Sequence, residues 1–141
     1  MDTIHVAFCV HDENGDYIQH TAVAMTSVFC NTKSLVRIHM IHDDTLRISQ
    51  KEILNALVRE YHQTIEYHQV DKKIFTDIAM KLKYATQRNF SIGTLFRLAI
   101  TDILSIDKVI YLDSDIIVNQ DIQALWSIDS SDFYIAAVRD L

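Results

Sequence analysis

The sequence contains no proline and only two glycines in 141 residues. With so few glycines, neither the G-x-G-x-x-G fingerprint nor the Walker phosphate loop can form. A nucleotide bound to this chain would therefore have to hold its phosphates through a metal ion and side chains. The two cysteines, Cys9 and Cys30, lie among apolar residues at no metal-binding or redox spacing, and we interpret both as reduced core thiols.

The chain also lacks an excess of positive charge and any long apolar segment. A formal net charge of −6 disfavours a nucleic-acid partner or an anionic membrane surface. No run approaches the ~18 apolar residues of a membrane span, and Asp2 and His5 interrupt the first residues, so we expect no signal peptide. The default location is then cytoplasmic, with peripheral membrane contact left open. The 49% hydrophobic and 23% charged composition predicts one globular domain over residues 1–141.

Strand-like and helix-like patterns alternate along the chain. Apolar, β-branched stretches predict strands at residues 4–10, 35–42, 64–70, 108–118 and 133–138. Apolar residues at steps of three and four predict helices over 17–29, 49–61, 71–83 and 91–104, with a short helical turn at 121–126. Ser49 and Glu52 have the spacing of a capping box, and Ser91 is a candidate cap. The alternation indicates an α/β fold, Rossmann-like, with a mostly parallel sheet and flanking helices.

Residues 108–118 read KVIYLDSDIIV and place two carboxylates between apolar runs. Ionised carboxylates beside a buried strand cost several kcal/mol unless a cation compensates them. In an extended segment, residues i and i+2 point the same way, so Asp113 and Asp115 would share a face with Ser114 turned away. Such a pair suits Mg²⁺ or Mn²⁺, which take one or two carboxylates plus phosphate oxygens. The alternative is a polar turn or strand end, in which the aspartates cap backbone N–H groups.

Further candidate residues come from a polar loop and from one helix. Ligands of open α/β sheets collect at the carboxyl ends of strands, so Asp12 and Asn14 are candidates for base or ribose contacts; the alternative is a solvated turn. His11 lies in the same loop, whereas the other six histidines have no partner at a zinc-binding spacing, and we interpret them as structural or exposed. Arg97 is either a partner that stiffens a metal-binding aspartate or a contact for a diphosphate or sugar.

Taken in order, these segments resemble glycosyltransferase family 8, the retaining nucleotide-sugar enzymes of the GT-A fold. The matching stretches are VAFCVHDENGDY, TAVAMTSV, TLFRLAITDIL, the D-S-D motif followed by IIV, and IQALWSIDSSDFYIAAVRD. The resemblance implies a metal-dependent hexosyltransferase. Its donor would be a UDP-sugar, and its acceptor a sugar, a lipopolysaccharide or a glycoprotein.

The resemblance also implies roles for individual residues. Asp113 and Asp115 would hold Mn²⁺ or Mg²⁺, Arg97 would lie close to the donor, and Asp140 would be the acidic residue that faces the sugar. Arg97 and Asp140 are therefore the candidate catalytic residues. The loop after the first strand is longer than the compact D-D-N-Y of the family, which leaves open which acid contacts the base. The candidate donor contacts are His11, Asp12, Asn14, Tyr17, Arg97 and Ser114.

The resembling enzymes continue for roughly as long again beyond the point that matches Leu141. We therefore expect this chain to be the N-terminal, donor-binding and metal-binding half, with weak binding and little or no turnover alone. A non-catalytic nucleotide-sugar-binding or interaction module is the first alternative. A haloacid-dehalogenase-like phosphatase, whose first aspartate would be a nucleophile, is the second. Homo-oligomerisation is a further prediction, because Trp126, Phe133 and Tyr134 could be left uncovered at one edge.

Overall fold

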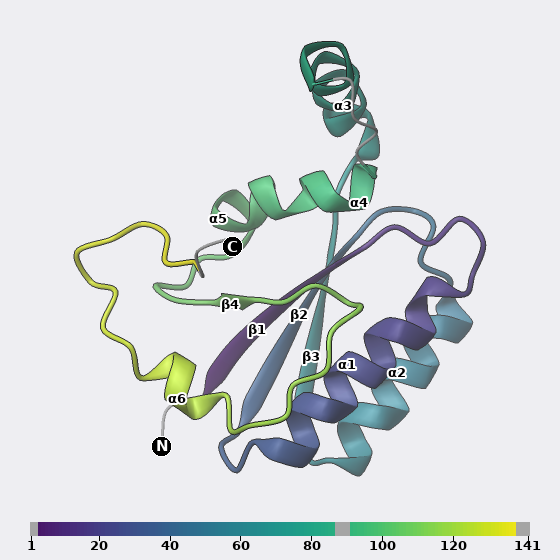
Figure 1. The fold of residues 1–141 in the computed structure, drawn as a ribbon. Helices are drawn as coiled ribbons and strands as arrows, with labels where there is room; N and C mark the ends of the chain where they lie inside the picture. The colour runs from purple at the N-terminus through teal and green to yellow at the C-terminus, as the bar shows by residue number, and fades with distance from the viewer. Residues whose placement is uncertain (1–2, 87–90, 138–141) are drawn as a thin grey trace.

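A computed structural model describes residues 3–86 and 91–137, and its centre is a four-stranded parallel sheet. The strand order is β3-β2-β1-β4, so β4 returns to the far side of β1 (Figure 1). This confirms the predicted α/β class with a parallel sheet and flanking helices. The strands are β1 (Ile4–Val10), β2 (Val36–His42), β3 (Thr64–Gln69) and β4 (Ile110–Tyr111).

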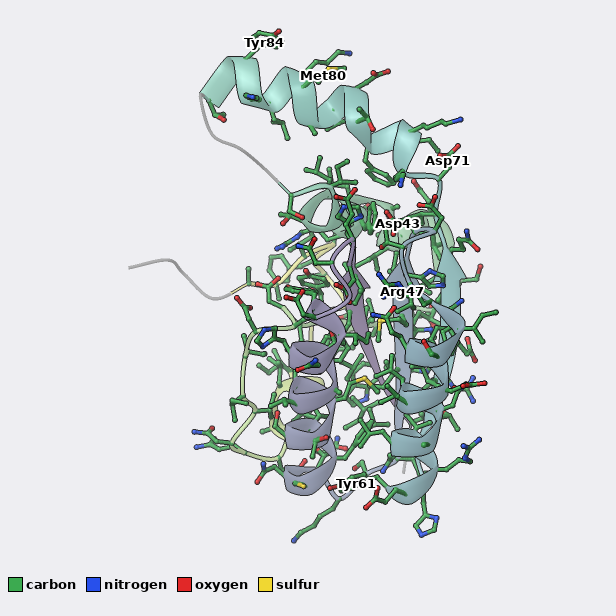
Figure 2. The ribbon with its side chains drawn as sticks, turned by 90° about the vertical axis from the view of Figure 1, so that its right-hand side faces the viewer. Asp43, Arg47, Tyr61, Asp71, Met80 and Tyr84 are labelled. Carbon is green, nitrogen blue, oxygen red and sulfur yellow. The ribbon has the colours of Figure 1, made fainter. Side chains whose placement is uncertain are left out.

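Helices α1 (Tyr17–Asn31) and α2 (Ile48–Glu60) lie side by side over one face of the sheet (Figures 1 and 2). Every second residue of β1 and β2 points to this face, and the apolar stripes of the helices close over them. Phe8, Met25 and Leu54 are fully buried there. Burying each such side chain contributes about 1.5–3 kcal/mol, so this layer supplies much of the stability.

On the other face, an apolar patch of the sheet is covered by the segments that follow β3. Ala7, Cys9 and Ile41 of the sheet pack there against Phe75 and Phe96. Beyond this contact α3 runs past the end of the sheet, and Figure 2 shows Met80 and Tyr84 on its outer side. The covering segments are α3 (Lys72–Thr86), α4 (Ile92–Leu95), the 3-10 turn η1 (Phe96–Ala99) and α5 (Ile100–Ile103).

Two helix predictions need correction. The single helix predicted over 91–104 is broken at η1, where the Arg97 side chain donates from Nε to the Thr94 carbonyl at 2.8 Å and so competes with the regular ladder. The predicted capping box is also misplaced: α2 begins at Ile48, and the Gln50 side chain accepts the Arg47 backbone N–H at 2.8 Å. Ser91 is the residue before α4, as predicted, but makes no side-chain cap.

Two strand predictions near the end of the described chain are wrong. The predicted strand over 108–118 pairs only at Ile110 and Tyr111, after which the chain leaves the sheet and its Val118 N–H donates to Ser27 Oγ of α1. Residues 133–137 form no strand, because a strand needs a hydrogen-bonding neighbour and none of the four described strands lies alongside them. Residue 138 lies outside the described residues. The short helical turn is confirmed as α6 (Gln123–Trp126).

Exposed apolar residues gather after α6. Phe133 and Tyr134 are exposed, whereas Trp126 is partly buried beneath the Lys108 ammonium, which lies 5.4 Å from its ring centroid. Self-association through this edge stays a prediction. Within the described residues, no helix is long and apolar enough to cross a membrane.

The second sheet face also carries three histidines that the sequence interpretation had left unconnected. His5 Nδ1 lies 2.8 Å from His39 Nε2, and His39 Nδ1 lies 3.1 Å from His68 Nε2. The three rings come from β1, β2 and β3, at positions 34 and 29 residues apart, so no local spacing could reveal them. All three nevertheless lie on one face of the sheet.

These histidines predict acid sensitivity. Burial first, with neighbouring positive charge second, lowers the pKa of His39 to about 4, and burial also lowers the pKa of His5 and of His42. A histidine whose pKa is lower in the folded state stabilises the fold above its unfolded pKa, and this stability is lost as the pH falls towards the folded pKa. We expect the protonation of His39 alone to lower the free energy of unfolding by on the order of 2 kcal/mol between pH 7 and pH 5.

Urea unfolding at pH 7 and pH 5 measures this loss. The variant His39→Gln has no titrating ring and should lose less stability over the same interval than the wild-type chain. An equal loss in both proteins would show that His39 does not carry the effect.

Candidate donor and metal site

The strand order reverses between β1 and β4, and a cleft of about 180 Å³ opens at their carboxyl ends. In open α/β sheets such a crevice is the usual place for a ligand, because the segments leaving neighbouring strands diverge there. The cleft lies between the end of β1, the turn after β4, and the segment that contains α4 and η1. Its lining residues are Cys9, His11, Tyr17, Ser91, Gly93, Thr94, Arg97, Tyr111, Asp113 and Ser114.

Asp113 is held at the cleft by two donors. Arg97 Nη2 donates to Asp113 Oδ1 at 3.1 Å, and the Tyr111 hydroxyl donates to the same oxygen at 2.8 Å. The Arg97 guanidinium also lies over the Tyr111 ring, 4.6 Å from its centroid. Burial and the hydrogen bond to Asp113 raise the pKa of Tyr111, so this phenol remains a donor. Asp113 Oδ2 has no hydrogen bond among residues 3–86 and 91–137, and it is the oxygen left for a cation.

Asp115 and Ser114 lie in a turn, not in the extended segment that the sequence analysis assumed. The alternation of side chains nevertheless holds: both aspartates are exposed, and Ser114 between them is 2% exposed. Tyr17 lines the cleft together with Asp113 and Ser114, and burial first, then the charges of Asp115 and Asp113, raises the pKa of its phenol. The buried Ser114 hydroxyl influences Tyr17 as well, but makes no hydrogen bond of good geometry within the described chain.

The donors present fit a hard divalent cation. Asp113 Oδ2 and the exposed Asp115 carboxylate are oxygen ligands of the kind that Mg²⁺ and Mn²⁺ take, with waters and phosphate oxygens completing the shell. The Ser114 hydroxyl lies between them in sequence with its hydrogen-bonding capacity unused by the described residues. The alternative interpretation was a polar turn whose aspartates cap backbone N–H groups. The turn is present, but neither aspartate caps a backbone N–H within the described residues.

His11 is oriented by a residue that the sequence analysis did not single out. His11 Nδ1 lies 2.6 Å from Oδ2 of the fully buried Asp43, which follows β2 (Figure 2). Burial alone would raise the pKa of Asp43, but hydrogen bonds from the Thr45 hydroxyl and N–H, then from His11, lower it overall. Because Asp43 is an acceptor, the His11 proton is assigned to Nδ1. Gly93 packs closely beside it: a Cβ there would lie 3.0 Å from His11 Cβ and 3.3 Å from its backbone nitrogen, so a larger residue would crowd the histidine.

Asp12 has a structural environment. It is 2% exposed, and its two oxygens accept hydrogen bonds from the backbone N–H groups of Gly15, Tyr17 and Ile18 and from Gln50 Nε2. A carboxylate offers about four acceptor positions, so these four donors fill it. A contact between Asp12 and a base stays a prediction, and it would require one of the four donors to be displaced.

The remaining predicted residues divide between the cleft and its surroundings. The cleft brings together His11, Tyr17, Arg97, Asp113 and Ser114, whereas Asn14 is exposed in the loop and does not line it. Asp140 lies outside the described residues, so its predicted role stays a prediction. The sequence analysis did not identify four residues of the site and its surroundings: Asp43, Thr45, Gln50 and Tyr111. Apart from the polar end of the second strand, no local pattern indicated a role for them.

The two thiols differ. Cys9 is buried in the floor of the cleft, where burial raises its pKa to about 12 and makes it a poor nucleophile. Cys30 is exposed, which corrects the prediction that it is a core thiol. Cys30 lies near the end of α1, and its Sγ is 3.5 Å from the Tyr61 hydroxyl instead of in the apolar interior.

The profile described as glycosyl transferase family 8 matches residues 5–141 of this sequence. The chain belongs to glycosyl transferase family 8. It is 30% identical over 88% of its length to a Haemophilus influenzae protein named, by inference only, as a glycosyltransferase, and 26% identical over 99% of its length to general stress protein A of Bacillus subtilis. The chain spans 36% and 47% of the lengths of these two relatives.

Solved structures support the fold assignment for this family 8 chain. The apo structure of the bifunctional glycosyltransferase WbbM superposes with a TM-score of 0.64 at 20% identity, over 92% of this chain and 22% of that one. Mouse xyloside xylosyltransferase 1 gives a TM-score of 0.54 at 21% identity, over 89% of this chain and 47% of that one. At these identities the likeness shows a shared fold, that of GT-A glycosyltransferases, and nothing about substrates.

Proposed function

We propose that this chain is the donor-binding part of a metal-dependent, retaining hexosyltransferase that uses a UDP-sugar. The observation that carries the proposal is the cleft at the carboxyl ends of β1 and β4, which has Asp113, Ser114 and Arg97 on its wall. Family membership supplies the class of enzyme; the donor, the metal dependence and the retained configuration are our proposals.

The residues of the cleft suit a diphosphate leaving group. Asp113 and Asp115 would hold Mn²⁺ or Mg²⁺, which, when bound, supplies Lewis-acid neutralisation of the charge that develops on the diphosphate. Arg97 places a second cation at the cleft wall, 3.1 Å from Asp113, where its guanidinium can turn to a phosphate oxygen. His11, fixed by Asp43, and Tyr17 stand at the end where we place the uridine. Asp140 is proposed as the carboxylate that faces the sugar and stabilises positive charge on its ring.

The cleft accounts for only part of a donor site. Its volume of about 180 Å³ is below the roughly 300–1,000 Å³ typical of sites for ligands of this size. Since the chain spans less than half the length of the two curated relatives compared, we propose that further donor contacts, and the whole acceptor site, come from sequence of the kind those relatives have in addition.

The two alternative functions differ in how well they fit this chain. Membership of family 8 argues against a haloacid-dehalogenase-like phosphatase, in which the first aspartate would be the nucleophile. Asp113 is moreover paired to Arg97 through one oxygen, an arrangement that lowers its nucleophilicity. A non-catalytic nucleotide-sugar-binding module stays the second candidate, because the same cleft would serve binding alone.

Calorimetric titration of UDP into the chain tests the proposal. We expect heat of binding in the presence of Mn²⁺ and at least about tenfold weaker binding, a loss of about 1.4 kcal/mol, in EDTA. UMP is the matched control ligand: it lacks the second phosphate, so Mn²⁺ should strengthen its binding much less. Equal heats with and without metal would contradict the metal-dependent site, and no binding of UDP in either buffer would contradict the donor site itself.

A further inference from the structure

The second sheet face carries a cluster of metal-ligating side chains that the donor cleft does not include. It consists of His39 on β2 and of Glu66 and His68 on β3. Their ligating atoms all lie within 4.8 Å of one another. None of the three lines the cleft, and the cluster lies on strands β2 and β3, not on the β1 and β4 ends that form it.

We propose that His39, Glu66 and His68 form a second metal site, for Zn²⁺ or a similar divalent ion that prefers nitrogen ligands. His39 Nδ1 lies 3.1 Å from His68 Nε2, Glu66 Oε2 lies 3.7 Å from His39 Nδ1, and the same oxygen lies 4.0 Å from His68 Nε2. Tetrahedral ligands about 2.0–2.1 Å from Zn²⁺ are separated by about 3.3 Å from one another. The two nitrogens have nearly this separation already, and the exposed Glu66 side chain has to approach them by less than about 1 Å.

The surroundings of the cluster also match those of a metal site. A ligating histidine usually donates its other ring N–H to a fixed acceptor, and here His39 Nε2 lies 2.8 Å from His5 Nδ1. Arg37 Nη1 donates to Glu66 Oε1 at 3.0 Å, which holds the carboxylate while Oε2 faces the two imidazoles. A histidine must be neutral to ligate a metal, and burial, followed by the charge of neighbouring His5, lowers the pKa of His39 to about 4.

The same surroundings select the kind of ion. The cluster offers two nitrogens and one carboxylate oxygen, and the Arg37 guanidinium already offsets part of the charge on that carboxylate. An ion that depends on negative charge, such as Mg²⁺ or Ca²⁺, gains little here, whereas Zn²⁺ binds imidazole well. His39 is 3% exposed, but Glu66 is exposed and His68 only partly buried, so an ion can enter from their side. Its role would be to join β2 to β3 on this face of the sheet.

Titration with Zn²⁺ in excess Mg²⁺ tests this site on the chain purified without a polyhistidine tag. Mg²⁺ occupies hard-oxygen sites such as the aspartate pair, so the remaining Zn²⁺ binding reports nitrogen ligands. We expect one Zn²⁺ per chain, with affinity reduced at least about tenfold in His68→Gln and in Glu66→Gln, and by about tenfold in His5→Gln, which keeps all three ligands.

Two matched variants control for other zinc ligands. His62→Asn removes an exposed histidine whose positive φ asparagine tolerates, and Cys30→Ser removes the exposed thiol; both should bind Zn²⁺ as the wild-type chain does. Urea unfolding gives a second readout, because Zn²⁺ should raise the midpoint of the wild-type chain and not that of His68→Gln. Absent Zn²⁺ binding, or binding unaffected by both His68→Gln and Glu66→Gln in folded protein, would overturn the proposal.

Discussion

Replacing Asp12 by alanine is expected to lower the free energy of unfolding by about 3–4 kcal/mol. The Asp12 carboxylate accepts from the Gly15, Tyr17 and Ile18 backbone N–H groups at 2.8, 3.1 and 3.0 Å and from Gln50 Nε2 at 2.9 Å. Two of these donors begin α1, and the fourth comes from the first turn of α2. A buried donor left without an acceptor costs about 1–3 kcal/mol, and water can satisfy only some of the four. Urea unfolding followed by far-ultraviolet circular dichroism measures the loss.

Asp16 provides the matched control for this prediction. By position Asp16 is the N-cap residue of α1, yet it is exposed and its side chain makes no capping hydrogen bond. Asp16→Ala should therefore change stability by less than about 0.5 kcal/mol. If Asp12→Ala and Asp16→Ala cost the same, the four hydrogen bonds do not fix the loop, and a role for Asp12 in contacting a base regains weight.

The loop shows why Asp12 could be found from the sequence but not its environment. The pattern identified a polar loop after a buried strand, and the strand, the loop and the helix after it are all where they were predicted. Gly15 has φ +88°, which lets the loop fold back so that Asp12 reaches N–H groups up to six residues ahead. Gln50, 38 residues away, arrives only through packing of α2 against the loop. No local pattern encodes that approach.

The D-S-D segment shows a similar division. Its alternation of exposure follows from the sequence, because a hydroxyl between two carboxylates is the residue least costly to bury. The apolar residues after it suggested a continuing strand, but Ile117 is exposed and the Val118 N–H is bonded to α1. An apolar run is equally consistent with a strand and with another kind of buried segment. Only a hydrogen-bonding neighbour makes the run a strand. In the described chain, the last such contact is the Leu112 N–H, which donates to the Ala7 carbonyl of β1.

Replacing both Asp113 and Asp115 by asparagine is expected to weaken binding of UDP with Mn²⁺ at least about 100-fold, a loss of about 2.7 kcal/mol. Asparagine keeps the size of the side chain, so the exposed turn should retain its shape, while the negative charge that holds the cation is lost. Titration calorimetry in Mn²⁺ measures the change. Asp107→Asn, at another exposed aspartate, is the control and should bind as the wild-type chain does.

The Asp113→Asn variant alone separates metal binding from the ion pair. Asp113 Oδ1 holds Arg97 Nη2 at 3.1 Å, so removing the charge of Asp113 frees the guanidinium to meet a phosphate. In EDTA, Asp113→Asn should therefore bind UDP at least as well as the wild-type chain, although it binds worse in Mn²⁺. Asp115→Asn leaves the ion pair intact and should bind worse in Mn²⁺ without any gain in EDTA. Unchanged Mn²⁺-dependent binding in both single variants and in the double variant would show that the aspartates do not hold the cation. A donor site at this cleft would then have to depend on Arg97 for its phosphate contact.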